Sequence, residues 1–127
     1  MRESVTSELA PTPVGPYSQA IRVDRLVFCA GQIALDPVTG ALVGADIGDQ
    51  TRQVLRNLGE VLRAAGTSFD HVVRTTVYLA DLDDFSRMNA VYGEFFGAPA
   101  PARSTIQAAR LPRDARVEID AIAVVPN

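Results

Sequence analysis

Residues 116–125, RVEIDAIAVV, constrain the fold more strongly than any other stretch of the sequence. Successive side chains of a β-strand point to opposite faces, so Val117 and every second residue after it form one apolar face. The other face is polar at first and then apolar, in the order Arg116, Glu118, Asp120, Ile122 and Val124. One face of this strand therefore belongs in the core, and the other still carries an apolar patch that needs a cover.

Two segments have the spacing of amphipathic helices. Apolar residues recur every three or four positions over residues 47–65, which predicts a helix with Asp46 or Asp49 at its start and Gly66 just past its end. The same spacing predicts a second helix over residues 83–96, which Gly97 and the prolines after it terminate. Two helices of these lengths can cover one face of a sheet.

The remaining regular segments read as strands. Residues 19–23 and 26–30 flank a turn and predict a hairpin; residues 71–79, 104–108 and 116–125 complete the set. In the segment 71–79 we expect Val73, Thr75, Val77 and Leu79 to share one face. The order ββαβαββ predicts an α+β fold with a mixed sheet and two helices on one face. The 127 residues fit a single domain, 1–127. Because the helices cover only one face, we expect Ile122 and Val124 to pack in a homo-oligomer.

The composition excludes several kinds of chemistry. All 12 cationic residues are arginine, so the chain has no lysine for a Schiff base or for a Walker A phosphate loop. His71 and Cys29 are the only residues of their types, so no zinc site, disulfide or resident metal is expected. A net charge of −3 with scattered arginines argues against a nucleic-acid surface. Without an apolar run long enough to span a membrane, the expected location is the cytoplasm.

Two charged residues are candidates for a small-molecule site. Arg103 follows a proline-rich loop at the start of a predicted strand, where its planar guanidinium suits a carboxylate; a surface ion pair is the alternative. Glu118 lies mid-strand and could position water as a base, or could simply pair with an arginine at the surface. Thr105 is two residues beyond Arg103, so both are expected on one face of the strand.

Tyr17 and Gly31 are weaker candidates from residue type alone. Tyr17 follows Gly15-Pro16 in a stiff loop and could cover a pocket or the core. Gly31 ends a strand and allows a ligand to approach the backbone, or makes a turn. The acidic residues Asp81, Asp83 and Asp84 are interpreted as helix-capping groups, and Cys29 as a core side chain.

Six ordered blocks carry a resemblance to a known family. They are GPYSQA (15–20), FCAGQIALDPVTG (28–40), VLRNLGEVLRAAG (54–66), VYLADLDDFSRMNAVYGEFF (77–96), PARST (101–105) and LPRDARVEIDAIAV (111–124). Together they closely resemble the RidA/YjgF/YER057c/UK114 family over nearly the whole chain. The resemblance implies a chorismate-mutase-like fold and a homotrimer with ligand sites between subunits.

The resemblance also implies an activity: cofactor-independent hydrolysis of 2-enamine and 2-imino acids, of the 2-aminoacrylate or 2-iminobutanoate type, to 2-oxo acids and ammonia. Arg103 matches the arginine that grips the substrate carboxylate, and Glu118 the acidic residue associated with the hydrolytic water. Tyr17, Gly31 and Asn89 match other residues at or near the pocket.

Thr105 departs from the cysteine that many RidA-type members have two residues after the arginine, which bears on substrate preference. A non-catalytic 2-oxo acid-binding or regulatory trimer is the main alternative. The endoribonuclease or translation-inhibiting activity of some relatives fits the acidic, lysine-free composition poorly.

Overall fold

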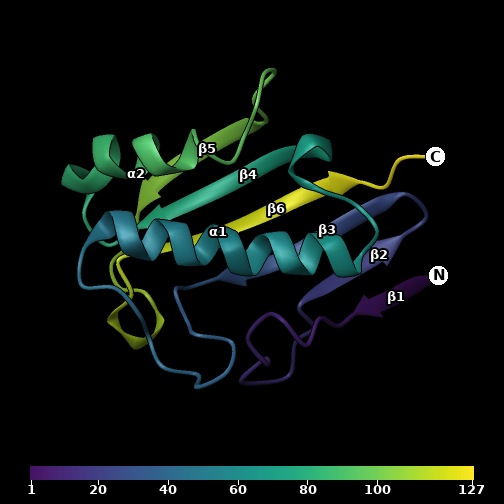
Figure 1. Ribbon diagram of the computed structural model, residues 1–127, viewed down its shortest axis with the longest axis horizontal. Helices are drawn as coiled ribbons and strands as arrows, with labels where there is room; N and C mark the ends of the chain where they lie inside the picture. Colours follow the sequence, from purple (N-terminus) through teal and green to yellow (C-terminus); the bar gives the residue numbers. More distant parts are fainter.

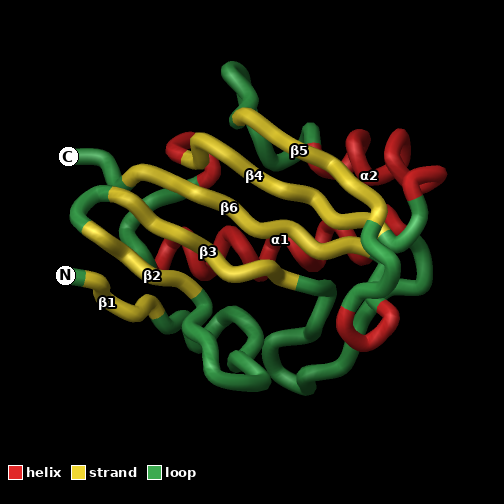
Figure 2. Tube along the Cα trace, turned by 180° about the vertical axis from the view of Figure 1, so that it is seen from behind, coloured by secondary structure: helices red, strands yellow, loops and turns green.

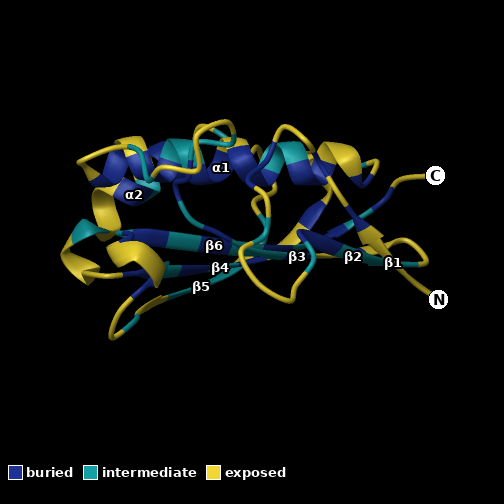
Figure 3. Cartoon of the chain, turned by 90° about the horizontal axis from the view of Figure 1, so that it is seen from below, coloured by how far each residue is buried: buried dark blue, intermediate teal, exposed yellow.

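The computed structural model describes residues 1–127 as a six-stranded mixed sheet with two helices on one face (Figures 1 and 3). The strands lie in the order β1-β2-β3-β6-β4-β5. Their bounds are β1 Arg2–Val5, β2 Ala20–Val23, β3 Leu26–Gln32, β4 Val72–Leu79, β5 Ala102–Gln107 and β6 Val117–Val124. Neighbouring strands are antiparallel except β4 and β5, which are parallel. The prediction of a mixed sheet with both helices on one side is confirmed.

Strand β1 is absent from the sequence-based prediction. It pairs with β2 at the edge of the sheet, with Arg2 opposite Val23 and Val5 opposite Ala20. Only Val5 of its four residues is buried, so the segment carries almost no hydrophobic pattern. Such a short edge strand is defined by its backbone pairing rather than by its side chains.

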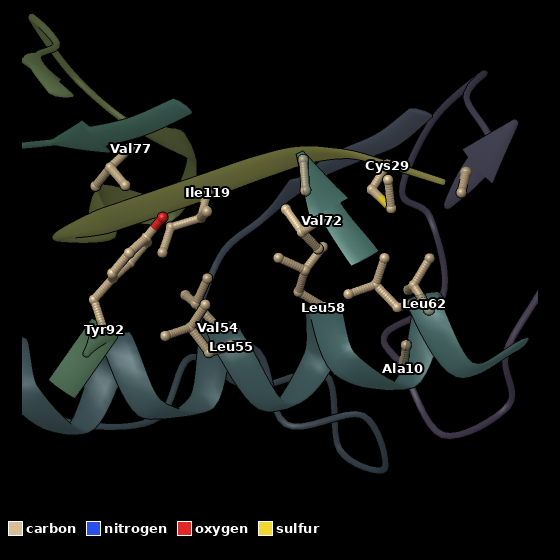
Figure 4. Packing of buried hydrophobic residues seen from close by; sticks show 14 of the residues in the cluster. Ala10, Cys29, Val54, Leu55, Leu58, Leu62, Val72, Val77, Tyr92 and Ile119 are labelled. Atoms are coloured by element: carbon tan, nitrogen blue, oxygen red, sulfur yellow. The ribbon is translucent and has the colours of Figure 1, made fainter. Parts of the chain in front are cut away.

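Helix α1, Ile47–Ala64, forms the centre of the core (Figure 4). The Asp46 carboxylate caps it by accepting a hydrogen bond from the Asp49 backbone N–H at 2.9 Å. Gly66 has φ +87° just after the last turn, a left-handed conformation that favours glycine. The apolar face of α1 packs on the inner residues of β6, where Val117 and every second residue to Ala123 are at most 2% exposed. The predicted helix and the predicted inner face of β6 are both confirmed.

Helix α2, Phe85–Tyr92, is shorter than the predicted helix 83–96. Residues Leu82–Asp84 form a 3₁₀ turn, and the Asp81 carboxylate accepts a hydrogen bond from the Asp83 N–H at 2.9 Å. After Tyr92 the chain unwinds, because Phe95 and Phe96 turn inward to meet the ring of Phe69 edge-on. Neither helix is long and apolar enough to cross a membrane.

The expectation for the inner face of β4 is wrong at one position. Thr75, Val77 and Leu79 are fully buried as expected, but Val73 is 47% exposed. A register shift against β6 between Val72 and Arg74 changes the alternation, so Val72 is buried instead. A bulge reverses the side-chain parity of a strand, and the sequence alternation alone does not reveal where it occurs.

The second face of the sheet has no helix over it (Figures 2 and 3). Leu26 and Phe28 of β3 are 42% and 43% exposed there, and they pair with Val124 and Ile122 of β6. Ile122 and Val124 are half-buried. The apolar patch expected from the sequence therefore lies on the face that the helices leave open, which we name the open face.

Candidate functional site

A cavity of about 580 Å³ lies at one end of the open face. Its charged and polar lining comes from Tyr17, Arg113 and Glu118, and Gly31 contributes backbone. The rest is apolar or proline: Val14, Ala30, Ile33, Leu35 and Pro112. Three of the residues singled out in the sequence, Tyr17, Gly31 and Glu118, are thus brought together from a loop, β3 and β6.

A β-bulge in β3 shapes the floor of this cavity. Cys29 pairs with Ala121 and Gln32 pairs with Ile119, so Ala30 and Gly31 together stand opposite Asp120 alone. A Cβ atom at Gly31 would overlap the Glu118 carboxylate and lie 2.9 Å from its carboxyl carbon. The absence of a side chain at residue 31 therefore makes room for the Glu118 carboxylate.

Glu118 is half-buried, and burial raises the pKa of its carboxyl above the ordinary value. The nearby negative charge of Asp120 raises this pKa further. No group of the chain donates a hydrogen bond to the Glu118 carboxylate, so none offsets these two effects. A partly desolvated carboxylate of raised basicity, facing a cavity, is suited to accept a proton from water.

Buried amides hold the loops that wall the cavity. Gln19 receives a hydrogen bond from the Ser7 backbone N–H at 2.6 Å and donates one to the Pro11 carbonyl at 2.9 Å. Asn57 of α1 donates to the Leu35 carbonyl at 2.9 Å. The Tyr17 hydroxyl accepts from the Val14 N–H at 3.3 Å, which fixes the ring in its own loop. The cavity wall is thus pre-formed in a single chain.

Arg113 lines the same cavity, and the sequence analysis did not identify it. Its φ of 57° places it in the left-handed region, as does the φ of 55° at Asp114. The turn directs the Arg113 guanidinium to the Gly40 carbonyl, to which it donates a hydrogen bond at 2.6 Å. The turn-like LPRDA segment predicts a reversal here, but no pattern in it shows which way the arginine points.

Arg103 lies on the other face of the sheet. It pairs with Thr75 across β4 and β5, and Thr105 pairs with Val77, so both share the inner face with those buried residues. The expectation that Arg103 and Thr105 point the same way is therefore confirmed. The Arg103 guanidinium carbon lies 4.7 Å from the ring centroid of Tyr92 and 5.6 Å from that of Phe85.

The aromatic contacts of Arg103 come from one face of α2, where Asn89 lies between Phe85 and Tyr92 in helical spacing. Tyr92 is anchored by a 2.7 Å hydrogen bond between its hydroxyl and that of Thr75. Burial raises the pKa of Tyr92. The Asn89 side-chain oxygen is buried without a hydrogen-bond donor in the chain. This oxygen is thus an unsatisfied buried polar atom on the face of α2 that holds Arg103.

Within one chain, Arg103 and Glu118 do not face one another. Glu118 pairs with Tyr78, which is on the open face of β4, whereas Arg103 pairs with the inward-facing Thr75. We name the cavity around Glu118, Gly31 and Tyr17 the acidic half-site. The group of Arg103, Thr105 and Asn89 is the arginine half-site.

Two other side chains considered from the sequence, Asp84 and Cys29, have structural roles. The Asp84 carboxylate accepts from Arg116 at 3.0 Å, and Cys29 is 7% exposed in the core. His71 and Asp70 lie next to each other at the start of β4, away from both half-sites. No three His, Cys, Asp or Glu side chains are grouped so that they could hold a metal ion.

The chain is similar to known proteins over nearly its whole length. The sequence profile of the endoribonuclease L-PSP family matches residues 7–125. A RutC family protein of Pyrococcus horikoshii is 53% identical, with 97% of this chain and 98% of that protein aligned. The 2-iminobutanoate/2-iminopropanoate deaminase of Mus musculus is 48% identical over 98% of this chain and 92% of its own length. The crystal structure of E. coli TdcF with bound serine has a TM-score of 0.92 at 41% identity, covering 96% of this chain and 98% of TdcF.

Proposed function

Because the chain belongs to the endoribonuclease L-PSP family, in which RidA and YjgF are also found, we infer that it is an enamine/imine deaminase. It hydrolyses 2-imino acids and their enamine tautomers to 2-oxo acids and ammonia. The relatives named for this reaction align over nearly their full length, as the mouse enzyme does. The observation in the structure that carries the assignment is the half-buried Glu118 carboxylate, which faces a cavity and has no hydrogen-bond donor of its own.

Glu118 is assigned the role of the base. The C2 atom of a 2-imino acid is already electrophilic, so hydrolysis requires only a water molecule held and deprotonated beside it. Glu118 takes a proton from that water as its oxygen bonds to C2. Glu118 returns that proton to the imine nitrogen, which gives the carbinolamine. Transfer of the carbinolamine hydroxyl proton to the same nitrogen then breaks the C2–N bond, so that ammonia leaves and the 2-oxo acid remains. Gly31 leaves room for the carboxylate, and the Tyr17 ring covers one side of the cavity.

The arginine half-site is assigned to the substrate carboxylate. A guanidinium placed over the Tyr92 ring can still offer its N–H edge to two carboxylate oxygens. Asn89 lies on the α2 face that holds Arg103 and is assigned to the arginine half-site, and the Thr105 backbone is assigned to hold water. The Thr105 side chain shares the inner face with Arg103 and is the residue expected to influence substrate preference.

We propose that the two half-sites meet between neighbouring copies in a homotrimer of the chorismate-mutase-like type. Three observations support this arrangement. The half-sites lie on opposite faces of one sheet, the open face has an uncovered apolar patch, and β5 with Arg103 is an edge strand. A ring of three copies can bury the patch and bring Arg103 of one subunit to Glu118 of the next.

Two substitutions separate the proposed roles. Arg103→Ala should abolish saturable hydrolysis through loss of substrate binding, whereas Glu118→Gln should retain affinity for 2-oxobutanoate and lose turnover. The assay follows 2-oxo acid release from an imine generated by a PLP-dependent dehydratase, with semicarbazide trapping to measure the remaining imine. The control is the uncatalysed rate in the same mixture. Binding of the 2-oxo acid without faster hydrolysis by wild-type protein would instead indicate a non-catalytic ligand-binding protein.

A further inference from the structure

We propose that Asp120, held in place by Tyr78, is a positioning residue that sets the basicity of Glu118; the catalytic part of this proposal rests on the deaminase function above. Asp120 does not line the cavity and does not contact the substrate in the proposed mechanism. It acts through Glu118. Three features of the open face place Asp120 near Glu118 and fix it there: strand parity, the Tyr78 hydrogen bond and the bulge in β3.

Strand parity brings the two carboxylates to one side. Glu118 and Asp120 are separated by one residue of the regular strand β6, whose burial alternates without interruption, so both point to the open face. Their Cα atoms are therefore about 7 Å apart. At such a distance, and with the reduced dielectric of a half-buried surface, the negative charge of Asp120 raises the pKa of Glu118.

The Tyr78 phenol holds the second carboxylate. Tyr78 lies directly opposite Glu118 in the β4–β6 ladder, yet its hydroxyl reaches diagonally and donates to the Asp120 Oδ2 atom at 3.0 Å. Burial, and then the hydrogen bond to Asp120, raise the pKa of Tyr78, so the phenol remains a donor at neutral pH. The hydrogen bond fixes the position of the Asp120 carboxylate on the open face.

The other charged groups near this face do not neutralise the pair within the chain. Arg116, two residues before Glu118, pairs with the Asp84 carboxylate at 3.0 Å. The Arg74 guanidinium donates to the Ser104 hydroxyl at 2.9 Å, on the β5 side of β4 and so away from β6. Arg113 donates to the Gly40 carbonyl at the far wall of the cavity. Strand β3 presents only Ala30 and Gly31 opposite Asp120, with Cys29 on the core side. In the proposed trimer, Arg103 of the next copy faces Glu118, and the substrate carboxylate pairs with that Arg103.

The chemical consequence is a better base. Burial and the Asp120 charge raise the pKa of Glu118 together. A carboxylate of higher pKa accepts the proton of the attacking water more readily, provided that its pKa stays below the working pH. The same proton is then passed to the nitrogen that leaves as ammonia, which returns Glu118 to its ionised form.

The test measures the pKa of Glu118 directly and does not depend on enzyme activity. Assembled protein is labelled with ¹³C at the glutamate carboxyls, the Glu118 resonance is assigned by its absence in Glu118→Gln, and it is titrated from pH 3 to 9. Asp120→Asn should lower the pKa of Glu118 by about one unit. Tyr78→Phe should lower it by less, because the charge remains but is hydrated. Asp120→Glu should restore it, and exposed Asp70→Asn at the distant end of β4 should not change it.

The kinetic arm uses the imine assay on the same variants. Asp120→Asn should lower kcat by about threefold at neutral pH with little change in KM, and should move the acid limb of the pH profile down with the pKa of Glu118. A Glu118 pKa that is unchanged in both Asp120→Asn and Tyr78→Phe overturns the proposal. If Asp120→Asn does not assemble, the Tyr78→Phe titration decides. A shifted pKa in a protein without deaminase activity would support the electrostatic coupling and refute the proposed function.

Discussion

Mixing two inactive variants tests whether each site takes Arg103 from one subunit and Glu118 from another. Arg103→Ala and Glu118→Gln are each expected to be inactive alone. In one chain these residues lie on opposite faces of the sheet, because Arg103 pairs with inward-facing Thr75 and Glu118 with outward-facing Tyr78. Equal amounts of the two variants are unfolded together and refolded, so that subunits assemble at random.

The expected recovery follows from the ring geometry. In a closed ring of three, each site uses Arg103 of one subunit and Glu118 of the next, so every mixed trimer contains one intact site. Random assembly makes about three quarters of the trimers mixed, and one site in three is intact in each. The mixture should therefore regain about 25% of wild-type activity, measured as 2-oxo acid release from a dehydratase-generated imine.

Two controls accompany the mixture. The variants mixed without unfolding should remain inactive until subunits exchange. The double variant carries both substitutions on one chain and is refolded with an equal amount of wild type. If each site is shared by two subunits, this mixture should have about 25% of the activity of an all-wild-type sample of the same total concentration; if each site lies within one chain, it should have about 50%. Activity in the refolded mixture that equals the sum of the separate variants would refute the shared site.

Other substitutions test the cavity, the core and the linkage to pH. Gly31→Ala should reduce turnover by at least about tenfold with folding retained, since its Cβ would displace the Glu118 carboxylate; kcat and a thermal melt measure the two effects. Ile119→Ala should lower the free energy of unfolding by about 2–5 kcal/mol in urea titrations, because Ile119 is fully buried. Asp46→Ala should cost about 1 kcal/mol through loss of the α1 cap, measured in the same titration. The folded-state pKa of Glu118 is raised, so ionisation of this carboxyl opposes folding. Glu118→Gln should therefore have a higher free energy of unfolding than wild type above this pKa. In urea titrations the difference should disappear as the pH falls below the unfolded-state pKa, which is near 4.3.

Much of the fold is predictable because its signals are local. The 3–4 spacing of α1 and the alternation of β6 depend only on which side chains must leave water, and both occur where they are predicted. Strand β1 and the bulge that exposes Val73 escape prediction because each arises from backbone pairing with a distant segment. Helix α2 ends early because the rings after Tyr92 pack on Phe69, which is far away in sequence.

The candidate site shows the same division. The residue types and the sequence motifs in which they occur single out Arg103, Glu118, Tyr17 and Gly31. The alternation of side chains along β5 places Thr105 on the same face as Arg103. Nothing local indicates that Arg113 lines the cavity, because a left-handed backbone turn aims its side chain. The Tyr78–Asp120 hydrogen bond is likewise invisible in the sequence, since it depends on the register of two strands about 40 residues apart.

By itself, the sequence determined which chemical groups are available: carboxylates, arginines and backbone groups, but no lysine. It also determined an α+β fold with an apolar patch on the sheet face that the helices do not cover. The tertiary structure decided where that chemistry can act. The register of β4 with β5 and with β6 puts Arg103 and Glu118 on opposite sides of a single sheet. Composition and periodicity describe each strand alone, whereas the relation between the two half-sites exists only once the strands are paired.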